Sequence, residues 1–228
     1  MPYHLSQNLS CCDVDGHMIF LDIAQDRYFR LSDRLEEATR RFLAHEGVAP
    51  NLLGHLETAR ILVKTTDVEA RATTARIQRP SCSAIEQASP IAQRRLGAAI
   101  AIEVVAIVWA TRRRLKVHAL KATLDEAIAY RDRNATPRET DTQAPVEAGL
   151  LHASRQFARA RRYAPIEPVC LLDSLSLLWF LSRRGLSANI VFGVMPEPFA
   201  AHCWVQAGAI VLNETLSDTN AYTPIRMV

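Results

Sequence analysis

Three residues near the C-terminal end of the chain have side chains that can act together in chemistry: Cys170, His202 and Glu214. Cys170 opens an apolar stretch predicted to be a helix. His202 lies in a predicted strand, and Glu214 is expected on the strand after it. A thiolate can attack a carbonyl carbon, an imidazole can hold the proton, and a carboxylate can fix the orientation of the imidazole. This order of residues predicts an acyl-transfer site with a cysteine nucleophile.

The predicted helix runs from Cys170 to Gly185, a residue that suits a helix C-terminus. Its apolar side chains have the spacing of a buried helix, and they are Leu171, Leu172, Leu175, Leu178 and Trp179. Cys170 therefore falls in the first turn, where free amides and the helix dipole favour a thiolate. The same amides can stabilise an oxyanion. A buried structural cysteine is the alternative, and Cys170 by itself does not exclude it.

Three short β-branched or apolar runs follow this helix, at 188–194, 200–206 and 209–212, and each is predicted to be a strand. Side chains alternate along a strand, so His202 and Cys203 are expected on opposite faces. Cys203 is therefore predicted to pack in the core and to be a poor nucleophile.

Two neighbouring residues compete to orient the His202 ring. Glu214 follows His202 across a tight hairpin, which can bring its carboxylate beside the imidazole. Asn213 is the alternative, because an amide can also orient a histidine. We favour Glu214.

The N-terminal part of the chain predicts a small α+β domain at residues 1–66. Asp15-Gly16 is a strong hairpin signal before a strand at 17–23. A strand at Tyr28–Leu31, helices within 32–60 and a short strand at 61–63 complete it. Residues 67–90 are polar and are predicted to be a linker, partly helical near 68–78. Residues 91–228 form the second predicted domain, with helices at 91–132, broken near 116–120, and at 146–162.

The bulk composition is that of an ordinary globular protein. The 228 residues are 49% hydrophobic and 22% charged, and the net charge of +3 is too small to indicate nucleic acid. Arginine clusters at 112–114, 159–162 and 183–184 are interpreted as solvated helix faces. The apolar run 96–110 contains Glu103 and predicts a buried helix rather than a membrane span.

Five cysteines without paired spacing, and no signal-peptide pattern, predict a soluble cytoplasmic protein. The other histidines have no partner at ligand spacing, so no metal is predicted; they are His4, His17, His45, His55, His118 and His152.

The stretch from Pro168 to Glu214 resembles the transglutaminase-like leader peptidases of lasso-peptide biosynthesis, in particular the maturation proteins of the microcin J25 and capistruin type. The matching segments are PVCLLDSLSLLWFLSRRG, NIVFGV, PFAAHCWVQ and VLNE. The resemblance implies a papain-like domain of helices and antiparallel sheet. It also implies that Cys170 is the nucleophile and His202 the general base, while Glu214 stands where many relatives have aspartate.

The first 66 residues resemble the PqqD-like element that recognises the precursors of ribosomally made peptides, which implies a three-stranded, winged-helix-like fold. In that family the leader peptide adds as a strand to the sheet and packs on a helix. The alternative is that the apolar residues implied in leader binding simply form the core of the domain. The residues implied in leader binding are Tyr28, Phe29, Arg30, Leu31, Leu52 and Leu56.

Together the two resemblances imply a cysteine peptidase that removes the leader of a lasso-peptide precursor. The freed amine would pass to an ATP-using macrolactam synthetase related to asparagine synthetase. No Gly-rich phosphate loop is visible, so no cofactor is expected on this chain and any ATP requirement is assigned to the synthetase. The alternatives are a transglutaminase or amidase that uses the same site, and a winged-helix DNA-binding regulator, which the modest charge disfavours.

Overall fold

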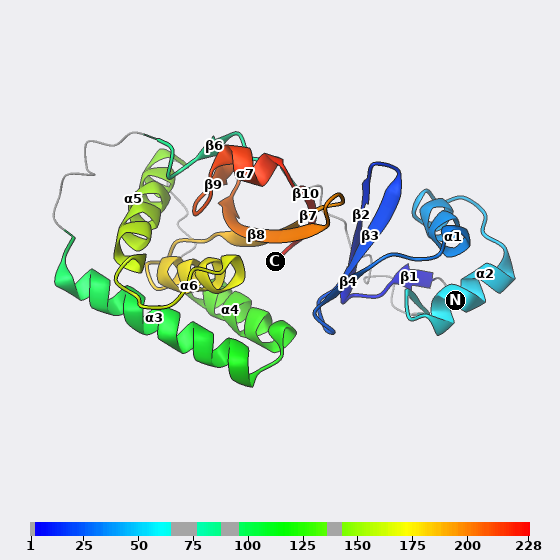
Figure 1. Cartoon of the computed structure of the whole chain (residues 1–228), viewed down its shortest axis with the longest axis horizontal. Coiled ribbons are helices and arrows are strands. Elements are labelled where there is room, and N and C mark those ends of the chain that lie inside the picture. Colours follow the sequence, from blue (N-terminus) through cyan, green and yellow to red (C-terminus); the bar gives the residue numbers. More distant parts are fainter. Residues whose placement is uncertain (1–2, 65–76, 88–95, 136–142) are drawn as a thin grey trace. The chain divides into compact units, whose positions relative to one another are not determined.

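The computed structural model describes residues 3–64, 77–87, 96–135 and 143–228 (Figure 1). The chain divides into two compact units, which we call unit 1 (Met1–Ile77 and Pro196–Pro198) and unit 2 (Gln78–Met195 and Phe199–Val228). The helix predicted near 68–78 lies almost wholly outside the described residues. Residues 78–87, predicted to be linker, belong to unit 2.

The described residues of unit 1 form two small sheets and two helices. A three-stranded antiparallel sheet has the order β2-β3-β4, and a separate antiparallel pair joins β1 to β5. The elements are β1 (Tyr3–Leu5), β2 (Leu9–Val14), β3 (His17–Asp22), β4 (Arg27–Phe29), α1 (Asp33–Leu43), α2 (Pro50–Thr58) and β5 (Leu62–Lys64).

The hairpin predicted at Asp15-Gly16 is confirmed. Both residues have positive φ, 53° and 82°, as a tight turn between β2 and β3 requires. The strand predicted at 61–63 forms as β5, but it pairs with β1 rather than with the main sheet. The sequence pattern does not predict β1, which is only three residues long. The three-stranded, winged-helix-like description is therefore incomplete.

Unit 2 combines a five-stranded sheet, of order β10-β7-β8-β9-β6, with a group of helices. All neighbours are antiparallel except β9 and β6. The elements are β6 (Cys82–Ser83), α3 (Ala98–Val117), α4 (Leu120–Asn134), α5 (Gln143–Arg161), α6 (Cys170–Ser182), β7 (Asn189–Met195), β8 (Ala200–Ala207), β9 (Ile210–Val211), α7 (Leu216–Asn220) and β10 (Thr223–Met227). The fold is thus mixed α and β.

Helix α6 is the centre of unit 2, packed between β8 and the helices α3, α4 and α5 (Figure 1). It is apolar on every side, which is typical of a helix buried all round. After it, Gly185 has φ +70°, and the amides of Gly185 and Leu186 donate to the carbonyls of Ser182 and Leu181. The predicted stop is confirmed, because α6 ends at Ser182 and the chain turns at Gly185, and the buried α6 fixes the position of its first residue, Cys170.

Helix α3 is buried on one face only, whereas the sequence predicts a buried helix at 96–110. One face is buried through Val104, Ile107 and Val108, but on the opposite face Ile102 and Trp109 are 69% and 50% exposed. No helix among the described residues has the length and apolar character needed to cross a membrane.

Candidate active site

The first turn of α6 presents Cys170. Val169 is extended, with φ −134° and ψ 130°, and the helix begins at Cys170 as predicted. The first helical hydrogen bond runs from the Asp173 amide to the Val169 carbonyl at 2.9 Å. The amides before Asp173 have no carbonyl of the helix to bond, so the positive end of α6 lies at the thiol.

His202 and Glu214 form a pair beside this turn. His202 is on β8, and its Nε2 is 3.2 Å from the Glu214 Oε1. The His202 and Glu214 side chains are 19% and 25% exposed. The sequence predicts a strand at Glu214, but this residue lies in the bend between β9 and α7. Because β9 ends at Val211, the chain turns off the sheet and carries the carboxylate to the imidazole.

The thiol and the imidazole shift each other's pKa in opposite directions. The pKa of Cys170 is lowered to about 4, first by a hydrogen bond from the Cys203 thiol and then by His202, against the effect of burial. The pKa of His202 is raised to about 9, chiefly by Cys170 and then by Glu214. At neutral pH the resting pair is therefore a thiolate and an imidazolium.

Cys203 has a larger part in the site than the alternation of β8 predicts. It is buried, as expected, but both its thiol and its main-chain amide bond to the Cys170 sulfur. Two residues along the same strand edge, the Val205 amide donates to the Asn213 Oδ1 at 2.7 Å. Amides two residues apart point to the same edge of a strand. Side-chain alternation predicts only which face of β8 each side chain occupies. The Cys203 amide points along the edge of β8, so alternation does not predict its contact with Cys170.

Asn213, the alternative partner for His202, has other partners. Its carbonyl oxygen accepts from Val205, and its amide donates to the Ser174 Oγ at 3.0 Å. The main-chain carbonyl of Glu214 accepts from the Ser83 Oγ at 2.6 Å. Ser83 belongs to β6, within the predicted linker, so this segment helps to position the carboxylate.

Two aromatic rings lie against the imidazole. The Tyr222 ring centroid is 5.2 Å from that of His202, and the Trp204 centroid is 6.3 Å away. Gly193 lies opposite His202 on β7. A Cβ at Gly193 would fall 2.8 Å from Trp204 and 2.9 Å from Tyr222, so this glycine allows both rings their close approach.

Arg161 anchors the start of α6, although the sequence predicts that its cluster at 159–162 is solvated. Its side chain is 10% exposed and its Nε lies 2.6 Å from the Asp173 Oδ1. It also donates to the carbonyls of Ala164 and Ile166. The turn before α6 has buried carbonyls that need donors, which was the available signal.

The residues implied in leader binding all lie in unit 1. Leu56 is fully buried in its core, so its side chain has no surface left for a peptide, and this part of the expectation is corrected. Phe29, Leu31 and Leu52 are partly buried against the same core. Arg30 is exposed and its guanidinium contacts the His17 Nδ1 at 2.5 Å. Tyr28 is partly buried on β4.

Within the described residues, no group of three or more His, Cys, Asp or Glu side chains is placed to hold a metal ion.

The profile of the transglutaminase-like superfamily matches residues 107–227, which is more than half of the chain and includes the whole of α6 and β8. The chain therefore belongs to the transglutaminase-like superfamily, whose members are typically cysteine-dependent enzymes. Among curated proteins, the microcin J25-processing protein McjB of Escherichia coli is 40% identical over 45 residues. That match spans 20% of this chain and 22% of McjB. No solved structure matches the chain.

Proposed function

We propose that this chain is a cysteine peptidase that removes the leader from a lasso-peptide precursor, with Cys170, His202 and Glu214 as its catalytic residues. The observation that carries the proposal is the His202 imidazole held between the Cys170 thiolate and the Glu214 carboxylate, 3.2 Å from the latter. Membership of the transglutaminase-like superfamily and the similarity to a microcin J25-processing protein support it.

In the acylation step the Cys170 sulfur attacks the scissile carbonyl carbon and forms a tetrahedral oxyanion. The free amides at the N-terminus of α6 are suited to stabilise the charge on that oxygen. The carbon–nitrogen bond then breaks, and the imidazolium of His202 gives its proton to the leaving amine. The products are a thioester on Cys170 and a core peptide with a free N-terminal amine.

In the deacylation step the now neutral His202 takes a proton from water as the water oxygen attacks the thioester. The carbon–sulfur bond breaks, the leader leaves with a C-terminal carboxylate, and the thiolate–imidazolium pair is restored. Glu214 holds the ring orientation through both steps and stabilises each imidazolium.

Unit 1 is proposed to bind the leader by adding it as a strand beside β4. In the described part of unit 1, β4 is the last strand of its sheet and pairs only with β3, so it offers an edge to an extended peptide. Tyr28, Phe29, Arg30 and Leu31 follow this edge, and Leu52 lies on α2. Tethering the leader raises the effective concentration of the scissile bond at the thiol.

The proposed partners are a lasso-peptide precursor and a synthetase that closes the macrolactam on the freed amine. A synthetase related to asparagine synthetase would supply the ATP chemistry. A cytoplasmic location accords with the free thiols of all five cysteines.

The test is to incubate the purified chain with its cognate precursor peptide and to follow the products by mass spectrometry. We expect a leader with a new carboxylate and a core shortened by the leader. Cys170→Ala should release no leader, while the matched Cys12→Ala variant in unit 1 should cleave at the wild-type rate. Leader release by Cys170→Ala would overturn the proposal.

The same experiment separates peptidase activity from the second candidate, amide transfer. The superfamily match favours this candidate as well, because an acyl-enzyme on Cys170 can pass to an amine instead of water. A product whose mass shows a crosslink, with loss of ammonia and an intact leader, would identify a transglutaminase and overturn the peptidase.

A further inference from the structure

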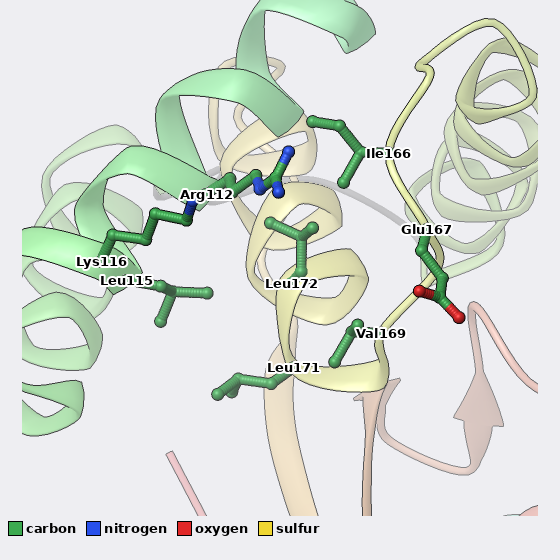
Figure 2. A pocket seen from close by; sticks show the side chains of 8 residues that line it. All are labelled: Arg112, Leu115, Lys116, Ile166, Glu167, Val169, Leu171 and Leu172. Carbon is green, nitrogen blue, oxygen red and sulfur yellow. The ribbon is translucent and has the colours of Figure 1, made fainter.

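A pocket of about 300 Å³ lies between α3 and the start of α6 (Figure 2). Val169, Leu171 and Leu172 line it and are the sequence neighbours of Cys170. Cys170 itself does not line the pocket, because its thiol faces Cys203 and His202 of β8, so the pocket and the thiol lie on different sides of the same first turn of α6. The mechanism described above does not use this pocket.

The lining of the pocket is mainly apolar. Leu115 on α3 and Ile166 before α6 face the leucines of α6 across the pocket (Figure 2). Val169 is 53% exposed, although it is a large apolar residue. An open apolar hollow of this size is unfavourable for water and suits an aliphatic or aromatic side chain.

The charges around the pocket favour a neighbouring carboxylate. Arg112 and Lys116 come from α3, and Glu167 lies across from them (Figure 2). In the ion pairs of the described residues, neither Arg112 nor Lys116 has an acidic partner, and the Arg112 guanidinium lies over the Trp109 ring at 5.8 Å. The pocket therefore has one excess positive charge beside its apolar lining.

We propose that this pocket binds an apolar side chain of the substrate peptide close to the scissile bond, with an adjacent substrate carboxylate facing Arg112 and Lys116. The inference rests on the proposed function, because it assigns the pocket to the substrate of Cys170. A helix with its side chains is about 10–12 Å across and an extended peptide advances about 3.3 Å per residue, so a peptide that passes the end of α6 places the bound side chain within about four residues of the bond that is cut.

The test uses peptide chloromethyl ketones, which alkylate an active-site cysteine with loss of chloride and need no leader. One acetyl-tetrapeptide probe contains only alanine, and in the others a single leucine occupies each position in turn. Labelling of Cys170 is followed by mass spectrometry of the whole protein and of its peptides. We expect one leucine probe to label about tenfold faster than the alanine probe.

Variants on α3 tie that preference to the pocket. Leu115→Trp fills the pocket, so the favoured leucine probe should label Cys170 no faster than the alanine probe. Leu115→Ala enlarges it and should shift the preference from leucine to phenylalanine, which keeps the test open if the tryptophan variant folds poorly. Val117→Trp, on the exposed surface of the same helix, should keep the wild-type preference.

The charge is tested by an aspartate placed beside the favoured leucine. It should increase labelling about threefold at low salt, and Arg112→Gln should remove the increase. Equal rates for leucine and alanine probes, a leucine preference that survives Leu115→Trp, or no gain from aspartate would each overturn the inference.

Iodoacetamide separates this inference from the proposed function, since the reagent is too small to use the pocket. Rapid alkylation of Cys170 with no leucine preference overturns the pocket alone. Slow alkylation of Cys170 at pH 6 overturns the proposed nucleophile, and the pocket assignment with it.

Discussion

The two units hold cysteines in opposite chemical environments. In unit 1, burial raises the pKa of Cys11 to about 11 and that of Cys12 to about 12. In unit 2, Cys170 is also partly buried, yet its pKa falls to about 4 because the Cys203 thiol and His202 stabilise the thiolate. Burial alone therefore makes a thiol inert, and hydrogen-bond donors with a neighbouring imidazolium make it reactive.

Of the substitutions proposed here, removal of His202 should most reduce the difference in reactivity between Cys170 and the cysteines of unit 1. His202→Gln removes the imidazolium, so leader release should fall by about three orders of magnitude and the pKa of Cys170 should rise. Steady-state cleavage of the precursor measures the first effect. His118→Gln, on an exposed residue at the end of α3, is the matched control and should cleave normally. Wild-type activity in His202→Gln would remove His202 from the mechanism.

Ion pairs give a second contrast between the units. Arg161→Leu in unit 2 leaves the Asp173 carboxylate, which is only 20% exposed, without its partner, and we expect a loss of about 3 kcal/mol in the free energy of unfolding. Arg41→Leu in unit 1 removes an exposed pair with Glu46 and should change it by at most about 1 kcal/mol.

Urea unfolding measures the change in the free energy of unfolding for both variants. Circular dichroism follows the whole chain, and tryptophan fluorescence follows unit 2, which holds all three tryptophans. Equal losses in the two variants would contradict the anchoring role of Arg161.

Glu214→Gln should slow leader release by about a hundredfold, since a neutral amide stabilises the imidazolium less. The pKa of His202 is raised to about 9 with Glu214 as its second cause, so the variant should lower it. Activity needs the imidazolium and is lost as pH rises through that pKa. The alkaline limb of the pH–rate profile should therefore move to lower pH. An unchanged limb would show that Glu214 does not act on His202.

Cys203→Ala should give the smallest change. It removes one thiol donor but keeps the main-chain amide, so the pKa of Cys170 should rise by about one unit. The acid limb of the profile then moves to higher pH, because the thiolate is lost as pH falls through its pKa. Cys12→Ala should leave the limb in place. A shift equal in both variants would argue against the Cys203 contact.

Local signals explain what the sequence could predict. The apolar spacing after Cys170 and the glycine at 185 define both ends of α6, and Asp15-Gly16 defines the first hairpin. The alternation around His202 gives β8. Each of these features depends on neighbours within a few residues, which is the range over which sequence patterns are informative.

The features that the sequence could not predict depend on tertiary contacts. The Cys203 contact depends on α6 meeting the edge of β8, a feature that strand periodicity does not encode. Arg161 looks like one of several surface arginines until the turn that it bonds is folded around it. Glu214 lies 3.2 Å from His202 but in a bend rather than on the strand that the sequence predicts, because nothing local marks the early end of β9.

The most direct test of the account is the alkylation of each cysteine by iodoacetamide across pH 3–10, resolved by peptide mass spectrometry. Cys170 should reach half of its maximal rate near pH 4 and stay fully reactive at pH 6, where Cys11 and Cys12 remain unlabelled. If Cys170 instead begins to react only above pH 8, together with the thiols of unit 1, it is no activated nucleophile and the account is contradicted.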